Sequence, residues 1–330
     1  MQTQIEKITA RSLEKAKNIL ENGGAVAFAT ETVYGLGTDA RSDEAVANVF
    51  RIKGRPSDNP LIVHVHRDYD INKLVKNIRP YVALLREAFL PGPLTLVYES
   101  RGAVSCLVSC GLQTIAIRVP SHEGAQSFLK YVDMPIAAPS ANVSKHVSPV
   151  TAEHVFDDLQ GKIPLILDGG ACSGGIESTV CDVTGDIPVI LRSGLITKEM
   201  IESVVGCCGV YTLKEGEKAR SPGLKYKHYS PRCSTKLFSC EELSSAKKYF
   251  YEKSSQGIKV LLLGESGILS DFPKDKVLDL GNNEFEMAAK LYDLLRRGEQ
   301  TADLIIAVEP VKKDGVMSGV LNRLRKACAE

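Results

Sequence analysis

The chain has 330 residues, a formal net charge of +1, 44% hydrophobic residues and 25% charged residues. This balance is typical of a soluble globular protein with room for two domains, and it excludes binding of nucleic acid or membrane through overall charge. The nine cysteines show no paired C-x-x-C spacing, which favours reduced thiols over a disulfide framework or a zinc site, and the lack of a signal peptide or of an apolar run of about 18 residues predicts a cytoplasmic protein with no membrane partner.

The first expected elements are a helix, a buried strand and a loop. Apolar residues at helical spacing predict a helix over 11–21 that ends at Gly23-Gly24. The short apolar run at 25–29 predicts a buried strand. Hydroxyl groups and two glycines follow at 30–38, and this composition predicts a loop that allows close approach of a ligand.

Two long cations then stand one residue apart. A helix is expected from an N-cap at Ser42 to near Ile52. Lys53-Gly54-Arg55 follows it and leads into an apolar strand at 61–65. On extended or turning backbone both cations can share one face and capture a polyanion such as a nucleotide triphosphate. A solvated basic turn is the simpler interpretation of the pair alone.

Short strands and helices alternate irregularly over the next part of the chain. Strands are expected at 94–98, 114–119, 135–139, 163–168, 178–183 and 188–192, and helices at 80–89, 122–131, 151–159 and 197–205. Strands outnumber helices, and few strand–helix–strand units repeat cleanly. This order predicts an α/β fold of the mixed, α+β type, with a twisted mixed sheet instead of a regular doubly wound one.

The character of the chain changes near residue 212. Residues 212–232 are rich in lysine and arginine and lack apolar periodicity, which predicts a linker or flap. Beyond it, strands at 236–238, 258–263, 276–279 and 303–308 are expected between helices at 241–253, 284–297 and 316–327. This alternation predicts a small three-layer α/β domain. The expected divisions are 1–211, 212–235 and 236–330.

Loops rich in small and hydroxyl residues leave several predicted strands, at 138–144, 174–180 and 191–194. Serine hydroxyls and backbone N–H groups suit phosphate oxygens, and arginines at strand ends, Arg118 and Arg192, can grip a carboxylate or phosphate with two N–H groups. Each loop alone is most simply a turn or an N-cap. Their recurrence indicates an anion site.

Four motifs in order carry a resemblance to a known family. Lys53-x-Arg55 followed by Ser140-x-Asn142 resembles the signature of the threonylcarbamoyl-AMP synthases. The surroundings agree with it: Thr30 to Gly37, Asn59-Pro60-Leu61, Glu177-Ser178-Thr179-Val180 and Ser221-Pro222-Gly223 with His228-Tyr229-Ser230-Pro231. The resemblance covers nearly the whole chain in the long, two-domain form. The sequence departs from it at Ala29, where the family often has proline, and at Val150, where it often has threonine.

The resemblance implies an enzyme that forms threonylcarbamoyl-AMP and pyrophosphate from L-threonine, bicarbonate and ATP, for the N6-threonylcarbamoyladenosine modification of tRNA at position 37. It implies a YrdC-like twisted open sheet with a central cationic cavity, a flap over the active site and a small Rossmann-like C-terminal domain. Mg²⁺ is expected on the ATP phosphates without a protein metal site. A downstream tRNA threonylcarbamoyl transferase complex is the implied protein partner, and weak binding of tRNA or double-stranded RNA stays open.

The resemblance also implies a role for each matched residue. Contacts to L-threonine are expected from Thr32, His64, Arg118, Ala138 and Ser178. Contacts to ATP are expected from Lys53, Arg55, Asn59, Thr114, Ser140, Asn142, Ser148, Arg192 and Tyr229. Lys53 and Arg55 are the expected catalytic residues, because preorganised cations can neutralise the charge that develops on pyrophosphate without a covalent enzyme intermediate.

Two other classes of function stay open on the sequence alone. An RNA-binding or regulatory module would use the basic segment at 212–232 without catalysis, although its tyrosines make a poor stacking platform. Another carbamoyl- or adenylyl-transferring enzyme, of the hydrogenase-maturation type, would need extra regions for which the chain has no room. Glu31 is either a carboxylate near the site or a structural cap. The order of carboxylation and adenylation, any general base and the oligomeric state are not indicated.

Overall fold

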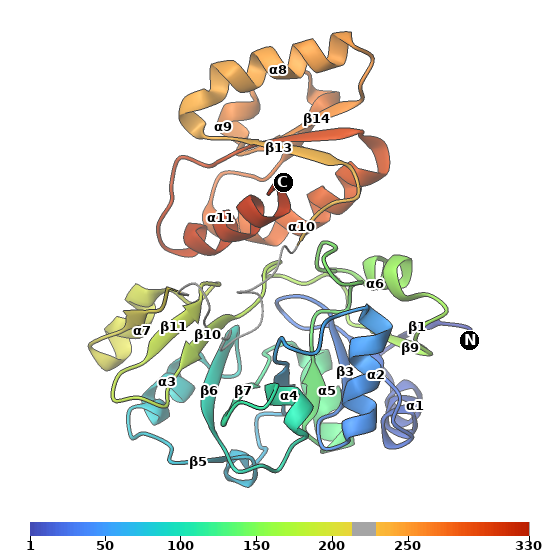
Figure 1. Ribbon diagram of the computed structural model, residues 1–330, viewed down its shortest axis with the longest axis vertical. Helices are drawn as coiled ribbons and strands as arrows, with labels where there is room; N and C mark the ends of the chain where they lie inside the picture. The colour runs from blue at the N-terminus through green and yellow to red at the C-terminus, as the bar shows by residue number, and fades with distance from the viewer. Residues whose placement is uncertain (213–228, 330) are drawn as a thin grey trace.

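The computed structural model describes residues 1–212 and 229–329, which form two sheets with helices packed on them (Figure 1). The strands of the larger sheet are β1 (Gln4–Lys7), β2 (Val26–Phe28), β3 (Gly35–Asp39), β4 (Ile62–His64), β5 (Val75–Lys76), β6 (Leu94–Ser100), β7 (Thr114–Arg118), β8 (Ile136–Ala138), β9 (Leu165–Asp168), β10 (Thr179–Asp182), β11 (Val189–Arg192) and β12 (Gly209–Val210). This sheet has 12 strands in the order β1-β9-β2-β3-β8-β4-β7-β6-β10-β11-β12, with β5 beside β6. The sheet contains both parallel pairs, such as β4–β7, and antiparallel pairs, such as β6–β7, so the predicted mixed sheet is confirmed.

The helices of this part are α1 (Ala10–Glu21), α2 (Asp43–Lys53), α3 (Val82–Phe89), α4 (Cys106–Ser109), α5 (Glu123–Val132), α6 (Ala152–Leu159) and α7 (Lys198–Val205). Those with clear apolar spacing lie where the sequence predicts them. Ser42 caps α2 by accepting a hydrogen bond from the backbone N–H of Ala45, and Gly54 ends it in a left-handed conformation with φ of 60°. The cap and the stop together place Arg55 directly after the helix.

The expected loop over 30–38 is wrong in its second half, because residues 35–39 form strand β3. A Cβ atom at Gly37 would lie 2.6 Å from Ile136 Cγ2 and 2.9 Å from Cε1 of Phe28. The glycine therefore lets β3 pack closely against side chains of β2 and β8. Turn-forming composition hid this strand, and elements of two to four residues, such as β5 and α4, are too short to show a periodicity.

The second sheet has four parallel strands in the order β13-β16-β14-β15. Its elements are β13 (Ser234–Phe238), α8 (Leu243–Ser255), β14 (Val260–Gly264), α9 (Ser266–Leu269), β15 (Val277–Asp279), α10 (Glu284–Thr301), β16 (Leu304–Val308) and α11 (Val316–Ala327). Figure 1 shows α8 and α9 on the outer face of this sheet, and α10 and α11 between the two sheets. The predicted alternation of strands and helices is confirmed.

A continuous hydrophobic cluster joins the two sheets. It contains Tyr34 and Ile176 from the larger part together with Leu291 of α10 and Val320 of α11, all buried. Removal of these apolar side chains from water holds α10 and α11 against the loops that leave the larger sheet. Among the helices of residues 1–212 and 229–329, none is long and apolar enough to span a membrane.

Candidate active site

Most of the residues that the sequence singled out converge on one pocket, called here the central pocket, whose empty space together with the open solvent at its mouth is about 680 Å³. Its lining contains Arg55, His64, Arg118, Ala138, Ser140, Asn142, Ser148, Ser178, Arg192 and Tyr229. The remaining predicted residues, Thr32, Lys53, Asn59 and Thr114, do not line it, although Thr32, Lys53 and Asn59 bond to residues that do. The segment 213–228, which includes most of the predicted flap, lies outside the described residues.

Arg55 brings a partly buried cation into the central pocket. Its Nη2 donates hydrogen bonds to the carbonyl oxygens of Asn59 (3.1 Å) and Pro60 (3.3 Å). Its buried Nε has no hydrogen-bond partner among the described residues. Burial lowers the pKa of Arg55 to about 10. A guanidinium held in this way keeps donor capacity for an anionic ligand.

Lys53 is a buried structural cation, so the solvated basic turn that the pair alone favoured is wrong. The side chain is 2% exposed. Its Nζ donates to the carbonyl oxygen of Ser140, to that of Asn142 at 2.5 Å and to Asn142 Oδ1 at 3.3 Å. Burial, followed by the nearby charge of Arg55, holds the pKa of Lys53 well below its ordinary value. These bonds tie the end of α2 to the 140–142 loop.

Arg118 and His64 lie side by side because β4 and β7 pair in parallel, with His64 opposite Arg118. Arg118 Nη1 donates to Thr32 Oγ1 at 2.7 Å, and Nη2 lies 3.0 Å from Glu31 Oε1 in a buried ion pair. Burial, and then the charge of Arg118, lower the pKa of His64 to about 3, so its imidazole is neutral near pH 7. Glu31 thus fixes the arginine, and the neutral histidine offers a hydrogen bond beside it.

Arg192 and Ser178 form the wall where β10 and β11 pair. Arg192 Nη2 donates to the carbonyl oxygen of Ser178 at 2.9 Å and to its Oγ at 3.2 Å. Ser178 Oγ also lies 2.8 Å from Thr95 Oγ1 on β6. Burial, and then the charge of Arg323, lower the pKa of Arg192. Arg192 and Arg55 are close enough that the charge of Arg192 contributes to the lowered pKa of Arg55.

Glu177 lines the pocket with partners that the sequence does not connect to it. Its Oε1 accepts a hydrogen bond from Ser148 Oγ at 2.7 Å, and its Oε2 accepts from Tyr292 Oη at 3.0 Å and from Arg323 Nε at 3.1 Å. Burial raises the pKa of Glu177, but the charges of Arg323 and Arg192 outweigh it and bring the pKa to about 2. Tyr292 and Arg323 lie within the helices predicted at 284–297 and 316–327. The sequence places them there but does not show that both contact Glu177.

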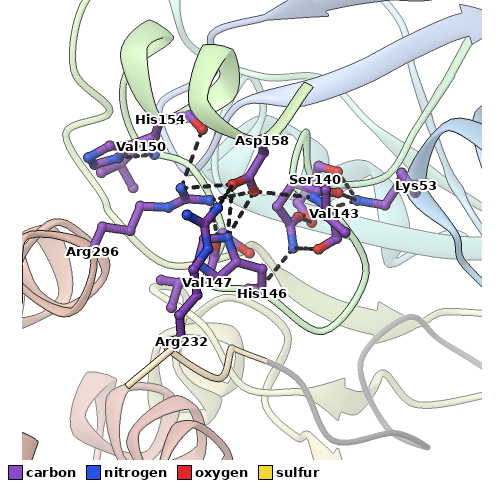
Figure 2. Close-up of polar contacts among 12 residues, drawn as sticks. Lys53, Ser140, Val143, His146, Val147, Val150, His154, Asp158, Arg232 and Arg296 are labelled. Carbon is purple, nitrogen blue, oxygen red and sulfur yellow. Dashed lines mark hydrogen bonds and ion pairs between the residues drawn. The ribbon is translucent and has the colours of Figure 1, made fainter. Parts of the chain in front are cut away.

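A second group of charges joins α6 to α10 next to the pocket (Figure 2). His146, which also lines the pocket, places Nδ1 2.9 Å from Asp158 Oδ1 and Nε2 2.8 Å from Glu299 Oε1. Arg296 reaches from α10 and donates from Nη2 to Asp158 Oδ2 at 2.9 Å, while Arg232 Nη2 lies 3.4 Å from Asp158 Oδ1. The cluster links both sheets through side chains on their facing helices.

Replacing His146 by glutamine is expected to destabilise the protein by about 1–3 kcal/mol near pH 6, and by less as the pH rises. Burial lowers the pKa of His146, but hydrogen bonds to Asp158 and Glu299 outweigh it and raise the pKa above its ordinary value of 6.5. The stabilisation by the protonated ring is therefore complete below 6.5 and is lost as pH rises through the raised value.

The two carboxylates act in the opposite sense. The pKa values of Asp158 and Glu299 are lowered despite burial, chiefly by hydrogen bonds from His146. Their contribution is present above their ordinary values of 3.8 and 4.5 and is lost as pH falls through the lowered values. Free energies of unfolding in urea, measured from about pH 5 to 9 for the wild type and His146→Gln, test the pH dependence expected from the histidine, because both carboxylates stay ionised over that range. A wild-type-to-variant difference that is constant with pH would contradict it.

Comparisons with known proteins cover nearly the whole chain. Residues 18–194 match the Sua5, YciO and YrdC family described as "Telomere recombination", and residues 196–329 match the family described as "Threonylcarbamoyl-AMP synthase, C-terminal domain". A threonylcarbamoyl-AMP synthase of Pyrococcus abyssi is 38% identical over 98% of this chain and 95% of its own length. One of Bacillus subtilis is 42% identical over 96% of this chain and 92% of its own length. The crystal structure of P. abyssi Sua5 complexed with L-threonine superposes with a TM-score of 0.90 at 38% identity, covering 99% of this chain and 96% of that one.

Proposed function

The chain belongs to the two-domain threonylcarbamoyl-AMP synthases, and from that premise we propose how its central pocket performs their reaction. The protein is a nucleotidyltransferase that forms threonylcarbamoyl-AMP from L-threonine, bicarbonate and ATP for N6-threonylcarbamoyladenosine modification of tRNA. One observation carries the proposal: a single pocket holds Arg55 and Arg192 within range of each other's charge, and Arg118 in a separate set of contacts. The pocket thus offers two anion sites, one for phosphates and one for a carboxylate.

ATP occupies the part of the pocket around Arg55 and Arg192. Two cations near each other suit the closely spaced charges of a triphosphate. The side-chain amide of Asn59 is buried, and neither of its polar atoms has a hydrogen-bond partner among the described residues, which supports a role in holding the nucleotide. The other contacts proposed for ATP come from Thr114, Ser140, Asn142, Ser148 and Tyr229.

L-threonine occupies the part around Arg118. The fork of this guanidinium matches the two oxygens of a carboxylate, and Thr32 and Glu31 hold it in place. The neutral imidazole of His64 lies on the neighbouring strand. The other contacts proposed for threonine come from Ala138 and Ser178, whose hydroxyl group lies in the pocket wall.

The chemistry that this arrangement supports is a single adenylyl transfer. The amino group of threonine bonds to the carbon of bicarbonate with loss of water, which gives an N-carboxylate. Its carbamate oxygen then forms a bond to the α-phosphorus of ATP while the bond from that phosphorus to the pyrophosphate oxygen breaks. Arg55 and Arg192 neutralise the charge that develops on pyrophosphate. Positioning of the reactants supplies the rest of the rate enhancement, so no enzyme-bound covalent intermediate is required.

Mg²⁺ enters as part of the MgATP substrate, held by the phosphate oxygens. The lining residues fit this arrangement, because the carboxylate that they include, Glu177, already accepts hydrogen bonds from Ser148, Tyr292 and Arg323. Bound Mg²⁺ would neutralise phosphate charge. The described side chains of the pocket then act on the phosphates mainly as cations and hydroxyl donors.

For Lys53, the contacts support a positioning role in the reaction. Its three acceptors all belong to Ser140 and Asn142, which line the pocket, and Ser140 Oγ itself donates to Asn142 Oδ1 at 2.5 Å. A direct contact with phosphate would require Nζ to leave a buried, fully bonded position. We therefore assign Lys53 to the support of the 140–142 loop and Arg55 to the phosphates.

We also propose the division into a YrdC-like domain at 1–211, a flap at 212–235 and a Rossmann-like domain at 236–330. Tyr229, near the end of the flap, lines the pocket and stacks on Tyr292 with ring centroids 5.4 Å apart. The product is expected to pass to a tRNA threonylcarbamoyl transferase complex. Family membership over nearly the full chain favours this enzyme over a non-catalytic RNA-binding module or a hydrogenase-maturation enzyme.

Exchange of labelled pyrophosphate into ATP tests the proposed mechanism. We expect exchange only when threonine and bicarbonate are both present, because the attacking oxygen belongs to their carbamate. The controls omit one substrate at a time and follow pyrophosphate release in parallel. Exchange with ATP alone would reveal an adenylated enzyme and would overturn the single-transfer mechanism.

A further inference from the structure

We propose that Arg323 of α11 is a positioning residue for the ATP part of the central pocket, so that the helices of the second sheet complete the active site. The proposal rests on the ATP contacts proposed above. Arg323 touches no proposed substrate site itself, and it acts through two neighbours, Glu177 and Ser193. Both belong to loops that line or flank the pocket.

Arg323 is fully enclosed, with 0% of its surface exposed. Its Nε donates to Glu177 Oε2 at 3.1 Å, and its Nη1 donates to the carbonyl oxygens of Ser193 at 2.6 Å and Gly319 at 3.3 Å. One planar side chain thus fixes the carboxylate of Glu177, which precedes Ser178, and the carbonyl group of Ser193, which follows Arg192. The fork geometry of guanidinium makes this double contact specific.

The contacts of Arg323 continue to groups proposed to bind ATP. Glu177 accepts the hydrogen bond of Ser148 Oγ at 2.7 Å, so the position of the carboxylate sets the position of that hydroxyl group. Tyr292 of α10 donates to the same carboxylate and carries Tyr229 on its ring face. Ser148, Tyr229 and the backbone that follows Arg192 are therefore held by helices of the second sheet.

The backbones of α10 and α11 lie directly on these loops. Gly175 has φ of 69°, and a Cβ atom there would collide with the carbonyl oxygen of Ala288 in α10. A Cβ atom at Gly319 of α11 would lie 3.3 Å from the Cα of Gly194. One glycine in a loop and one in a helix permit this approach, and it leaves little freedom for the loops to move independently of the helices.

Arg323 also controls which cation the Glu177 carboxylate attracts. Both Arg323 and Arg192 stabilise the ionised form of Glu177, and Arg323 contributes more. A buried carboxylate that loses its main partner seeks another, because an unpaired buried charge is costly. Without Arg323, Glu177 would draw Arg192 away from the carbonyl oxygen of Ser178 and would neutralise it. The phosphates would then lose one of their two cations.

The test compares Arg323→Met with Arg325→Met. Arg325 lies on the same helix but is exposed and pairs with Glu309, at 2.6 and 3.0 Å, outside the lining of the pocket, and it serves as the matched control. We expect Arg323→Met to raise the KM for ATP by about 10-fold or more and to lower kcat, from the loss of charge-assisted hydrogen bonds. The KM for threonine should change by less than about 3-fold, because Arg118 and Thr32 are held within the larger sheet. Arg325→Met should match the wild type.

A second variant keeps the proposal testable if Arg323→Met does not fold. Glu177→Gln combined with Arg323→Met removes both buried charges and avoids an unpaired carboxylate. It too should show a raised KM for ATP, because Ser148 and Ser193 remain unsupported. A folded variant with an unchanged KM for ATP, or with equal rises for ATP and threonine, would overturn the proposal. Wild-type protein that releases pyrophosphate without threonine would instead overturn the proposed function.

Discussion

Replacing Arg55 by methionine is expected to lower kcat/KM for ATP by about 10³-fold, the scale at which arginines act on phosphoryl transition states. Its guanidinium lines the pocket with Nε unpartnered among the described residues. The charge that develops on departing pyrophosphate would lose a preorganised partner, while threonine binding would be little affected. Steady-state pyrophosphate release at varied ATP concentrations measures the effect.

The same substitution should leave the fold intact and even raise its melting temperature slightly. Burial lowers the pKa of Arg55 to about 10, which means that the folded protein holds the charged form less well than water does. Such a charge is kept for function at a cost in stability. Arg51→Met, an exposed position one turn earlier on α2, is the control and should have no effect. Activity of Arg55→Met above about one tenth of wild type would remove Arg55 from the phosphate site.

Much of the fold follows from local sequence signals. α2 is an example: Ser42 caps it, apolar residues recur at helical spacing and Gly54 ends it. Two strands of the second sheet, β14 and β16, are clear because each is a short apolar run next to a helical segment. β3 is different, since its glycines are typical of a turn and are required here by the packing of Phe28 and Ile136. A contact made in three dimensions overrides the local signal, and no periodicity shows it.

The candidate site also contains residues that the sequence could predict and residues that it could not. Residues within motifs, such as Arg55 and Ser140, could be assigned to one pocket because strand ends bring such loops together. The partners of Glu177 could not be, since Tyr292 and Arg323 lie 115 and 146 positions away along the chain. Nor does a sequence separate Lys53 from Arg55, two cations in one motif. Burial decides between them, because Lys53 has its donors bonded to a loop, whereas Nε of Arg55 has no hydrogen-bond partner among the described residues.

In the proposed division of the pocket, the two sheets have different tasks. The carboxylate part depends on β4 and β7, whose register sets His64 beside Arg118. The phosphate part depends on loops that α10 and α11 hold from outside. Changes in the second sheet should therefore alter the use of ATP before they alter recognition of threonine. The cluster around His146 and Asp158 has the separate task of joining α6 to α10.

Arg118→Lys is expected to raise the KM for threonine by about 100-fold, because lysine keeps the charge but loses the planar fork that binds two carboxylate oxygens. Lysine is the better test than methionine, since it leaves a cation near Glu31, which pairs with Arg118 in the buried wall. The KM for ATP should stay within about 3-fold of wild type, because Arg55 and Arg192 are untouched.

Varying threonine at saturating ATP and bicarbonate, and then ATP at saturating threonine, separates the two constants for Arg118→Lys. Arg67→Lys is a suitable control, because Arg67 is an exposed arginine just beyond β4. If threonine is recognised through its carboxylate at Arg118, an analogue with a carboxamide should lose affinity for the wild type and little further for the variant. An unchanged KM for threonine in Arg118→Lys would place the threonine carboxylate elsewhere in the pocket. An equal rise in the KM for ATP would show that the threonine and ATP parts of the pocket are not separate.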